Sequence, residues 1–266
     1  MTDFAPGLSV ILITKNEGRR LDRCLTSVSF ADEIIVLDGA SHDNTVEIAK
    51  THCAKVVVDA AWPGFGAQKN RVLAMATREW VLSIDADEAV TEQLAESIRQ
   101  IVSGVLATDT GRSGEPACGF VLSRLSCFAG RPLRFGDWAS DRVLRLVRNG
   151  HARFSDVPVH EQLLCDGPTA RLEGRLMHYT LDSMADARDK AHRYAQAAAP
   201  RVASRGKGGL VSACVHGGWA FIRGAFLRLG FLDGLYGFKL AWANAYGTWL
   251  RYRIAGRLRR EESVQG

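Results

Sequence analysis

The stretch WVLSIDADE, residues 80–88, places three acidic side chains directly after a run of apolar residues. Residues 80–84 have the short, apolar composition of an interior β-strand. In open α/β sheets, ligands bind outside the carboxyl ends of such strands. Carboxylates crowded there repel one another unless a cation or a hydrogen-bond donor offsets their charge, and a divalent metal that bridges a nucleotide diphosphate commonly does so. The stretch therefore predicts an α/β fold with a nucleotide site at this edge.

Short strand-like runs recur on both sides of this stretch and alternate with segments of helical spacing. The predicted strands are Leu8–Ile13, Glu33–Leu37, Lys55–Val58, Trp80–Ile84, Gly119–Leu125, Val143–Val147 and Ala170–Met177. Such alternation is typical of a mostly parallel, Rossmann-like central sheet with flanking helices. Thr91 is expected to cap a helix, and residues 103–117 are expected to form a surface loop. A further helix is predicted over 182–199 and should end at Pro200.

Composition divides the chain of 266 residues into two regions. The net charge is +5, yet residues 200–260 carry eleven Lys and Arg against the single Asp233. We therefore predict a catalytic domain over 1–200, with a donor half at about 8–105 and an acceptor half at about 117–200. A basic, aromatic, helical tail is predicted over 201–266.

The tail is rich in Trp, Phe and Tyr, but Arg223, Arg228 and Lys239 interrupt it before about 18 apolar residues accumulate. An amphipathic segment that lies on an anionic membrane surface is the favoured interpretation. The alternative is a helix that packs its aromatic residues on the catalytic domain. Nucleic acid is not an expected partner, because no nucleic-acid-binding motif is present.

Six cysteines lie far apart, without a Cys-x-x-Cys pair, and residues 1–3 do not open a signal peptide. We therefore expect a reduced, cytoplasmic compartment, with the protein peripheral on the inner face of the cytoplasmic membrane. The oligomeric state is left open.

Polar clusters follow the first strands of the predicted sheet. The first cluster, TKNEG at 14–18, could bind a base or ribose through Thr14, Asn16 and Glu17, or could simply start a helix with Asn16 as its cap. In the second cluster, LDGASHDNT at 37–45, Asp38 is the candidate for nucleoside contact, while Asp43 is expected to cap the following helix. The third cluster, WPGFGAQKNR at 62–71, joins a glycine loop to a helix start and could offer Gln68 and Lys69 to a phosphate, although such a cation can also be solvated.

The order of these motifs resembles the family-2 glycosyltransferases of the GT-A fold. The chain is most similar to the bacterial lipopolysaccharide-core β-1,4-glucosyltransferase group, and later stretches at 141–146, 159–161 and 177–179 continue the resemblance. The resemblance implies that Asn16, Glu17, Asp38 and Lys69 surround a nucleoside diphosphate. It also implies that Asp85 meets ribose or metal and that Asp87 holds Mg²⁺ or Mn²⁺.

One position departs from this group, because its usual Ser-Gly after the acidic residue is Gly39-Ala40 in this chain. The turn therefore requires Ala40 in a conformation that glycine adopts more easily.

An inverting transfer needs a base beside the acceptor and positive charge beside the departing diphosphate. We favour Glu161 as the base, with His160 to orient it, and keep Asp141 as the second candidate. In the structural alternatives, Glu161 pairs with Arg171 or Arg175, and Asp141 pairs with Arg142 or Arg145. His178 is a further candidate metal ligand, although an isolated histidine is more often a hydrogen-bonded core residue.

These patterns predict an inverting, metal-dependent hexosyltransferase that uses a nucleotide sugar, with UDP-glucose as the favoured donor. A lipid-linked saccharide, as in the lipopolysaccharide core, is the expected acceptor. Three alternatives stay open: the same scaffold with a heptose or galactose donor, a sugar-phosphate nucleotidyltransferase, and a membrane scaffold that binds nucleotide without turnover. The second is disfavoured because TKNE follows the first strand in place of a glycine-rich turn.

Overall fold

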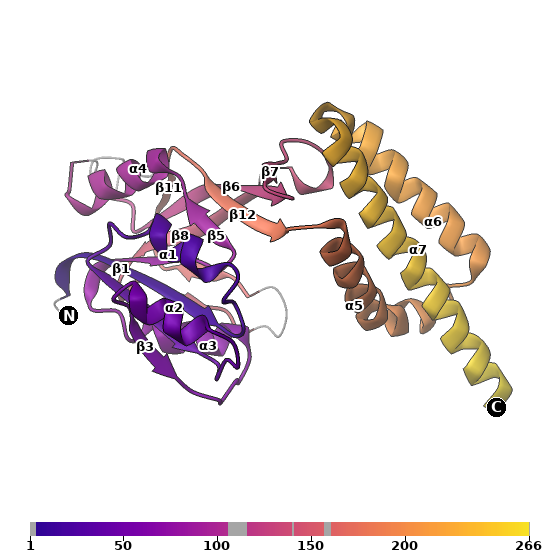
Figure 1. Cartoon of the computed structure of the whole chain (residues 1–266), viewed down its shortest axis with the longest axis horizontal. Coiled ribbons are helices and arrows are strands. Elements are labelled where there is room, and N and C mark those ends of the chain that lie inside the picture. The colour runs from indigo at the N-terminus through magenta and orange to yellow at the C-terminus, as the bar shows by residue number, and fades with distance from the viewer. Residues whose placement is uncertain (1–3, 106–115, 140, 157–160, 266) are drawn as a thin grey trace. The chain divides into compact units, whose positions relative to one another are not determined.

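A computed structural model describes residues 4–105, 116–139, 141–156 and 161–265 of the chain. It divides into two compact units (Figure 1), of which the first comprises Met1–Arg124 and Asp141–His178 and the second comprises Leu125–Ser140 and Tyr179–Gly266. This grouping differs from the predicted division at residue 200.

The first unit is built on a mixed β-sheet with helices on both faces. Its strands are β1 (Ala5–Thr14), β2 (Glu33–Asp38), β3 (Lys55–Val58), β4 (Arg78–Ser83), β5 (Glu88–Val90), β6 (Gly119–Phe128), β8 (Asp141–Arg148), β11 (Thr169–Arg171) and β12 (Leu176–Leu181). The last residues of β6 and of β12, from Leu125 and from Tyr179 onward, are grouped with the second unit. A separate ribbon pairs β9 (Ala152–Phe154) with β10 (Leu163–Cys165). The helices are α1 (Leu21–Ser27), α2 (Thr45–Thr51), α3 (Phe65–Leu73) and α4 (Glu92–Val102).

The strand order β3-β2-β1-β4-β8-β6-β12-β5 places the earliest strands side by side. Strands β1 to β4 pair with one another in parallel, whereas β8 is antiparallel to both β4 and β6. Because β1, β2 and β4 point the same way, Thr14, Asp38 and Asp85 emerge at one edge of the sheet. The predicted α/β sheet with flanking helices is confirmed, but its second half is mixed, because β11 pairs parallel with β6 while β8 and β5 form antiparallel pairs.

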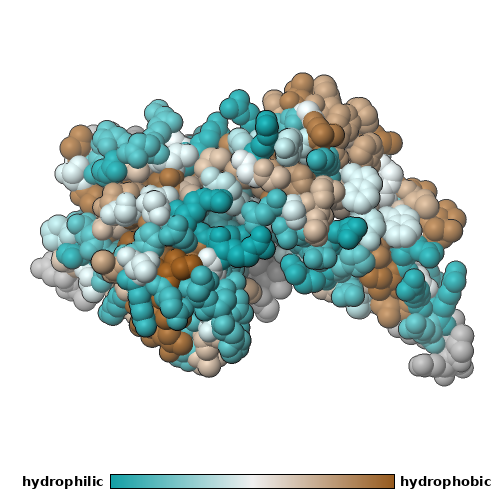
Figure 2. All heavy atoms as spheres, in the orientation of Figure 1, coloured by the Kyte–Doolittle hydropathy of each residue, from teal (hydrophilic) through white to brown (hydrophobic). Residues whose placement is uncertain are grey.

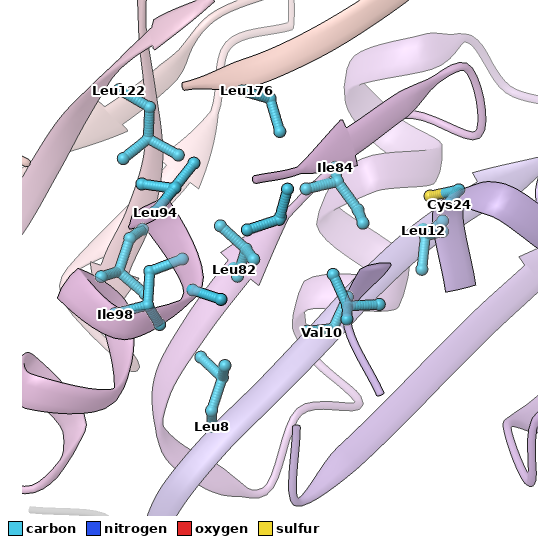
Figure 3. Packing of buried hydrophobic residues seen from close by; sticks show 14 of the residues in the cluster. Leu8, Val10, Leu12, Cys24, Leu82, Ile84, Leu94, Ile98, Leu122 and Leu176 are labelled. Carbon is cyan, nitrogen blue, oxygen red and sulfur yellow. The ribbon is translucent and has the colours of Figure 1, made fainter. Parts of the chain in front are cut away.

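Alternate residues of the central strands bury against different layers of helices. Leu8, Val10 and Leu12 of β1 pack with apolar side chains of α1, α2 and α4 (Figure 3). Ile11, between them, packs in a second cluster with Val72 and other residues of α3. The alternation follows from the two-residue period of a strand, and it makes the first unit an α/β/α sandwich.

Three predicted details are corrected. The strand predicted at 170–177 is two strands, β11 and β12, separated at Gly174, where φ is +93° and an added Cβ would lie 2.4 Å from the Leu94 nitrogen. Asn44 rather than Asp43 is the cap of α2, although Asp43 accepts a hydrogen bond from the Thr45 nitrogen at 3.1 Å. The helix predicted to end at Pro200 is α5 (Met184–Ala203), which continues past this proline. A proline near the end of a helix removes only one hydrogen bond within the helix, so the helix can continue.

The second unit is largely helical. Besides α5 it contains β7 (Arg131–Pro132), η1 (Gly136–Trp138), α6 (Leu210–Ile222), the π-helical turn η2 (Arg223–Leu227), η3 (Gly230–Asp233) and α7 (Gly234–Gln265). Leu133, Leu181, Leu240 and neighbouring residues form its core. Both α5 and α6 pack along α7, and this confirms the predicted helical character of the C-terminal region.

Much of the apolar surface of the second unit is exposed. Val211, Leu227 and Leu235 each leave more than 60% of their surface accessible. Apolar side chains gather over the end where η2, η3 and the start of α7 meet (Figure 2). Among the described residues, Leu210–Leu227 is long and apolar enough to cross a membrane by length and composition.

Candidate active site

Thr14, Asp38 and Ser41 form a hydrogen-bonded cluster where β1 and β2 end. The Asp38 carboxylate is fully buried and accepts from the Thr14 hydroxyl at 2.8 Å and from the Ser41 hydroxyl at 2.6 Å. The turn after β2 requires Ala40 at φ +58°, so the strained alanine expected from the sequence is confirmed. Asn16 also has a positive φ, and its Oδ1 accepts from the His42 nitrogen at 2.8 Å. Asn16 therefore ties two loops together and does not cap α1, whose cap is Arg20.

Alternating charges connect the carboxylates at the end of β4 to those of the later strands. Lys69 Nζ lies 2.9 Å from Asp85 Oδ1 and 3.0 Å from Glu161 Oε1. Asp85 Oδ2 lies 2.6 Å from Arg145, which also contacts Glu88 at 2.8 Å. These five side chains come from four separate parts of the chain and form one continuous ion-pair network.

The network continues from Glu88 to the start of β8. Glu88 is fully buried and is 3.1 Å from Arg124, whose guanidinium also binds Asp141 through two hydrogen bonds of 3.1 and 2.7 Å. Asp141 is therefore held by Arg124 rather than by Arg142 or Arg145, and its own side chain is half exposed. Its link to Lys69 passes through Arg124, Glu88, Arg145 and Asp85.

Asp85 is the most strongly perturbed acid in the network. Burial by itself would raise its pKa, but the charges of Arg145 and then Lys69 outweigh burial and hold the pKa of Asp85 well below its usual range. Burial likewise opposes the charge of Arg145, and the carboxylates of Asp85 and Glu88 reverse that effect and raise the pKa of Arg145. Asp85 and Arg145 are therefore charged at neutral pH, and each carboxylate oxygen of Asp85 has a cation beside it.

Asp87 lies apart from this network, beside His178. The distance from Asp87 Oδ2 to His178 Nε2 is 3.3 Å, and Arg20 Nη1 lies 3.9 Å from the same oxygen. The contact is set by the sheet, because β12 pairs antiparallel with β5 and His178 is the partner of Glu88. Glu17 interacts electrostatically with Asp87, because the pKa of Glu17 is raised first by burial and then by the charge of Asp87.

A divalent cation fits the chemistry of this pair. Within the described ranges, no three His, Cys, Asp or Glu side chains are gathered as a complete metal site. Mg²⁺ is commonly held by one or two protein carboxylates together with substrate phosphates. Asp87 and His178 supply an oxygen and a nitrogen whose separation is 3.3 Å. Asp85, which was also predicted to bind metal, forms ion pairs with Lys69 and Arg145.

The remaining predicted residues have clear positions. Gln68 is buried, and its side-chain oxygen accepts from Arg71 at 2.8 Å. Glu161 pairs with Lys69 and shows no ion pair with Arg171 or Arg175 among the described contacts. His160, which was expected to orient Glu161, lies outside the described residues.

Four charged residues of this region were not assigned roles from the sequence: Glu88, Arg145, Arg124 and Arg20. The sequence shows that Glu88 is close to Asp85, because both belong to one acidic stretch, but it does not show that the Glu88 side chain is completely buried. Arg124 and Arg145 stand on β6 and β8 among other arginines, and nothing in the local pattern separates them from solvated residues.

The chain is similar to known glycosyltransferases over most of its length. Residues 9–104 match the family described as Glycosyl transferase family 2. The uncharacterized glycosyltransferase RP128 of Rickettsia prowazekii is 29% identical in a match that covers 92% of this chain and 85% of the length of RP128. The lipopolysaccharide core biosynthesis glycosyltransferase LpsC of Rhizobium meliloti is 25% identical over 91% of this chain and 82% of its own.

Two solved structures are also similar. The Staphylococcus aureus TarS 1-349 complex with UDP-GlcNAc has a TM-score of 0.35 and 23% identity, and covers 46% of this chain and 34% of that one. Glucosyl-3-phosphoglycerate synthase from Mycobacterium tuberculosis, in complex with Mn²⁺, UDP and glucosyl-3-phosphoglycerate, has a TM-score of 0.32 and 25% identity. The match covers 46% of this chain and 43% of the synthase chain. The chain thus spans less than half the length of either solved chain. The match over 9–104 includes Thr14, Asp38, Lys69, Asp85 and Asp87, and this part of the chain is a family-2 glycosyltransferase domain.

Proposed function

We propose that the chain is an inverting hexosyltransferase that moves glucose from UDP-glucose onto a lipid-linked saccharide of the lipopolysaccharide inner core. The family-2 domain supports the reaction class. The observation that carries the proposal is Lys69, whose ammonium group stands between Asp85 and Glu161 at the carboxyl edge of the parallel strands. A cation and a carboxylate are thus side by side where a donor diphosphate and an acceptor hydroxyl would meet.

In the proposed reaction the acceptor oxygen bonds to the anomeric carbon while the bond to the diphosphate breaks. Glu161 takes the proton of the acceptor hydroxyl as the base. Lys69 offsets negative charge on the departing diphosphate, and Asp85 holds Lys69 in place. Asp141 is the weaker candidate for the base, because both of its oxygens are bound by Arg124.

Asp87 and His178 are the proposed ligands of Mg²⁺ or Mn²⁺. When bound, such an ion supplies further charge neutralisation at the diphosphate. Asp38, Thr14, Asn16 and Glu17 are the proposed surroundings of the nucleoside, since their side chains and loops lie at the ends of β1 and β2.

The acceptor proposal rests on similarity and on exposed surface. LpsC, the relative from Rhizobium meliloti, is named for lipopolysaccharide core biosynthesis. A lipid-linked acceptor resides in a membrane, and the second unit exposes Leu227, Leu229, Leu232 and Leu235 at one end. Apolar side chains beside cationic ones favour binding to an anionic membrane surface. We propose that the protein acts at the cytoplasmic face of the inner membrane.

A donor screen tests the nucleotide part of this proposal. A ligand that binds only the folded state raises the free energy of unfolding, by about 2.7 kcal/mol at a concentration of a hundred times Kd, and so raises the melting temperature. We expect UDP-glucose to raise it more than ADP- or GDP-glucose, and Mn²⁺ to increase the shift in the wild type but not in Asp87→Ala. UDP-heptose or UDP-galactose giving the largest shift would replace glucose as the donor.

An activity assay tests the role of Glu161. Loss of a general base typically costs about 10²–10⁴-fold in rate. We expect Glu161→Gln to slow UDP release with a lipid-linked acceptor by such a factor while UDP-glucose still raises the melting temperature. Glu173→Gln, an exposed acid on the same unit, is the matched control and should keep its rate. Donor binding without UDP release by the wild type, across several authentic acceptors, would favour the scaffold alternative.

A further inference from the structure

Two adjoining cavities lie within the helical second unit, between η1 and helices α5, α6 and α7. Their volumes are about 310 and 510 Å³, within the range of small-molecule sites. They share the side chains of Trp138, Asn244, Thr248 and Arg251. The last three are on one side of α7 at helical spacing, so a single helix face lines both cavities.

The lining of these cavities is cationic. Lys190 and Arg251 line the first cavity, and Arg223, Arg228 and Arg251 line the second, against the single acid Asp137. Asp137 is already engaged, because Arg228 lies 2.9 Å from one carboxylate oxygen and Arg223 lies 3.2 Å from the other. Lys190 and Arg251 are thus the two cationic side chains that line the first cavity.

The cavities also offer a flat aromatic wall. Lys190 Nζ lies 5.6 Å from the ring centre of Trp138 and 5.9 Å from that of Tyr194, so its charge is held beside the aromatic rings that line the first cavity.

The Arg251 Nε–H is buried and has no hydrogen-bond partner among the described residues. Buried donors are normally satisfied, so an unpartnered guanidinium nitrogen beside a cavity is consistent with a missing anionic ligand.

The surface next to the second cavity is apolar. Trp219 lines that cavity and also belongs to the exposed apolar face of α6, with 54% of its surface accessible. A ligand seated in the cavity could therefore carry an apolar portion along α6. A sugar ring suits Trp138, and a phosphate suits two cations, because guanidinium groups bind phosphate oxygens through paired hydrogen bonds.

We propose that these cavities bind a saccharide that carries a phosphate group, held by Lys190 and Arg251 and stacked on Trp138. This inference rests on the proposed function, because it assigns to the second unit the binding of a charged part of the acceptor. The phosphate could belong to a soluble phosphosugar or to a lipid headgroup, and the two sources share the same chemistry.

The test measures binding of glucose 6-phosphate to the full chain by calorimetry, with glucose and inorganic phosphate as comparisons. We expect glucose 6-phosphate to bind more tightly than either. Arg251→Gln and Lys190→Met should each weaken it about tenfold, because a hydrogen bond to a charged group is worth about that much. Arg257→Gln removes the same charge from an exposed position of α7 outside both cavities and should leave binding unchanged.

Equal weakening by Arg251→Gln and Arg257→Gln would overturn the proposal, as would glucose binding as tightly as its phosphate. Because Arg251→Gln could disturb packing, Arg251→Lys is the second variant; it keeps the charge, loses the planar fork and should bind with intermediate strength. Vesicles of phosphatidylcholine with and without phosphatidic acid identify the source. Binding of phosphatidic acid that depends on Arg251 indicates a lipid headgroup, and binding of soluble phosphosugar alone indicates a soluble ligand.

Failure of this inference is separable from failure of the transferase proposal. The melting shift with UDP-glucose should persist in Arg251→Gln, since Lys69 and Asp87 are unchanged. A chain that binds glucose 6-phosphate but shows no shift with any nucleotide sugar would keep the cavity site and lose the proposed donor.

Discussion

Ala40 stands in a conformation that costs an alanine more than a glycine. Its φ is +58°, and the neighbouring Ser41 must hold the Asp38 carboxylate, so the turn cannot relax without disturbing that cluster. We expect Ala40→Gly to keep or raise the free energy of unfolding, since relief of strain offsets the greater freedom of the unfolded chain. Ala74→Gly, at φ −65° on the exposed end of α3, should lower it by about 0.5–1 kcal/mol. Urea unfolding of both variants checks this, and a larger loss at position 40 would contradict it.

Asp85 is the centre of the buried network, and its loss leaves Lys69 and Arg145 without their shared partner. We expect Asp85→Asn to lower the free energy of unfolding at pH 7 by about 3 kcal/mol, as for other broken buried ion pairs. Asp166→Asn removes an exposed pair with Arg153 and should cost less than about 1 kcal/mol.

The effect of Asp85 should depend on pH in a defined direction. The pKa of Asp85 is lowered in the folded protein, so its contribution is present above the unfolded value of about 3.9 and is lost as pH falls below it. The difference between wild type and Asp85→Asn should therefore shrink as urea unfolding is repeated from pH 6 down through about pH 3. A difference that stays constant over this range would show that Asp85 does not act through its charge.

At the scale of elements, glycines decide how closely the helices of the second unit approach. A Cβ added at Gly256 of α7 would lie 2.4 Å from the nitrogen of Gly209, just before α6. A Cβ at Gly218, on the exposed side of α6, would meet nothing within 4 Å. We expect Gly256→Ala to lower the melting temperature, because backbone atoms must separate, and Gly218→Ala to raise it through a gain of helix propensity of about 1 kcal/mol. Thermal unfolding of the two variants would refute this packing if both moved the same way.

At the scale of the whole molecule, the charges divide between the two units. The second unit contains sixteen Lys and Arg against seven Asp and Glu, so it is strongly basic while the remainder is net acidic. Basic and exposed apolar surface occur together in the unit that is proposed to meet the membrane, whereas the proposed donor site is built in the acidic one.

The proposed membrane contact predicts that acidic substitutions at this surface weaken vesicle binding. We expect the wild type to sediment with anionic vesicles and the double variant Leu227→Glu/Leu235→Glu to lose this binding, because both exposed side chains would place acids at the interface. Val105→Glu, at an exposed position of the first unit, is the matched control and should bind as the wild type does. Unchanged sedimentation of the double variant would exclude this surface as the contact.

What the sequence determined by itself was local. Apolar periodicity predicted the strands and helices of the first unit, and the polar residues after them predicted the edge where Asp38 and Asp85 lie, because parallel strands end together. The sequence motifs resemble those of family-2 glycosyltransferases, and the family match over residues 9–104 confirms this resemblance. The strain at Ala40 was also predictable, since it depends on one turn.

The tertiary structure decided which charges meet. Arg145 reaches Asp85 across 60 positions of the chain, and Lys69 reaches Glu161 across an even longer stretch. Such pairs depend on which strand lies beside which and on the depth of each side chain, and neither is written in local composition. The cavities of the second unit are likewise products of packing, because Trp138 and Arg251 come from segments that only the folded chain brings together.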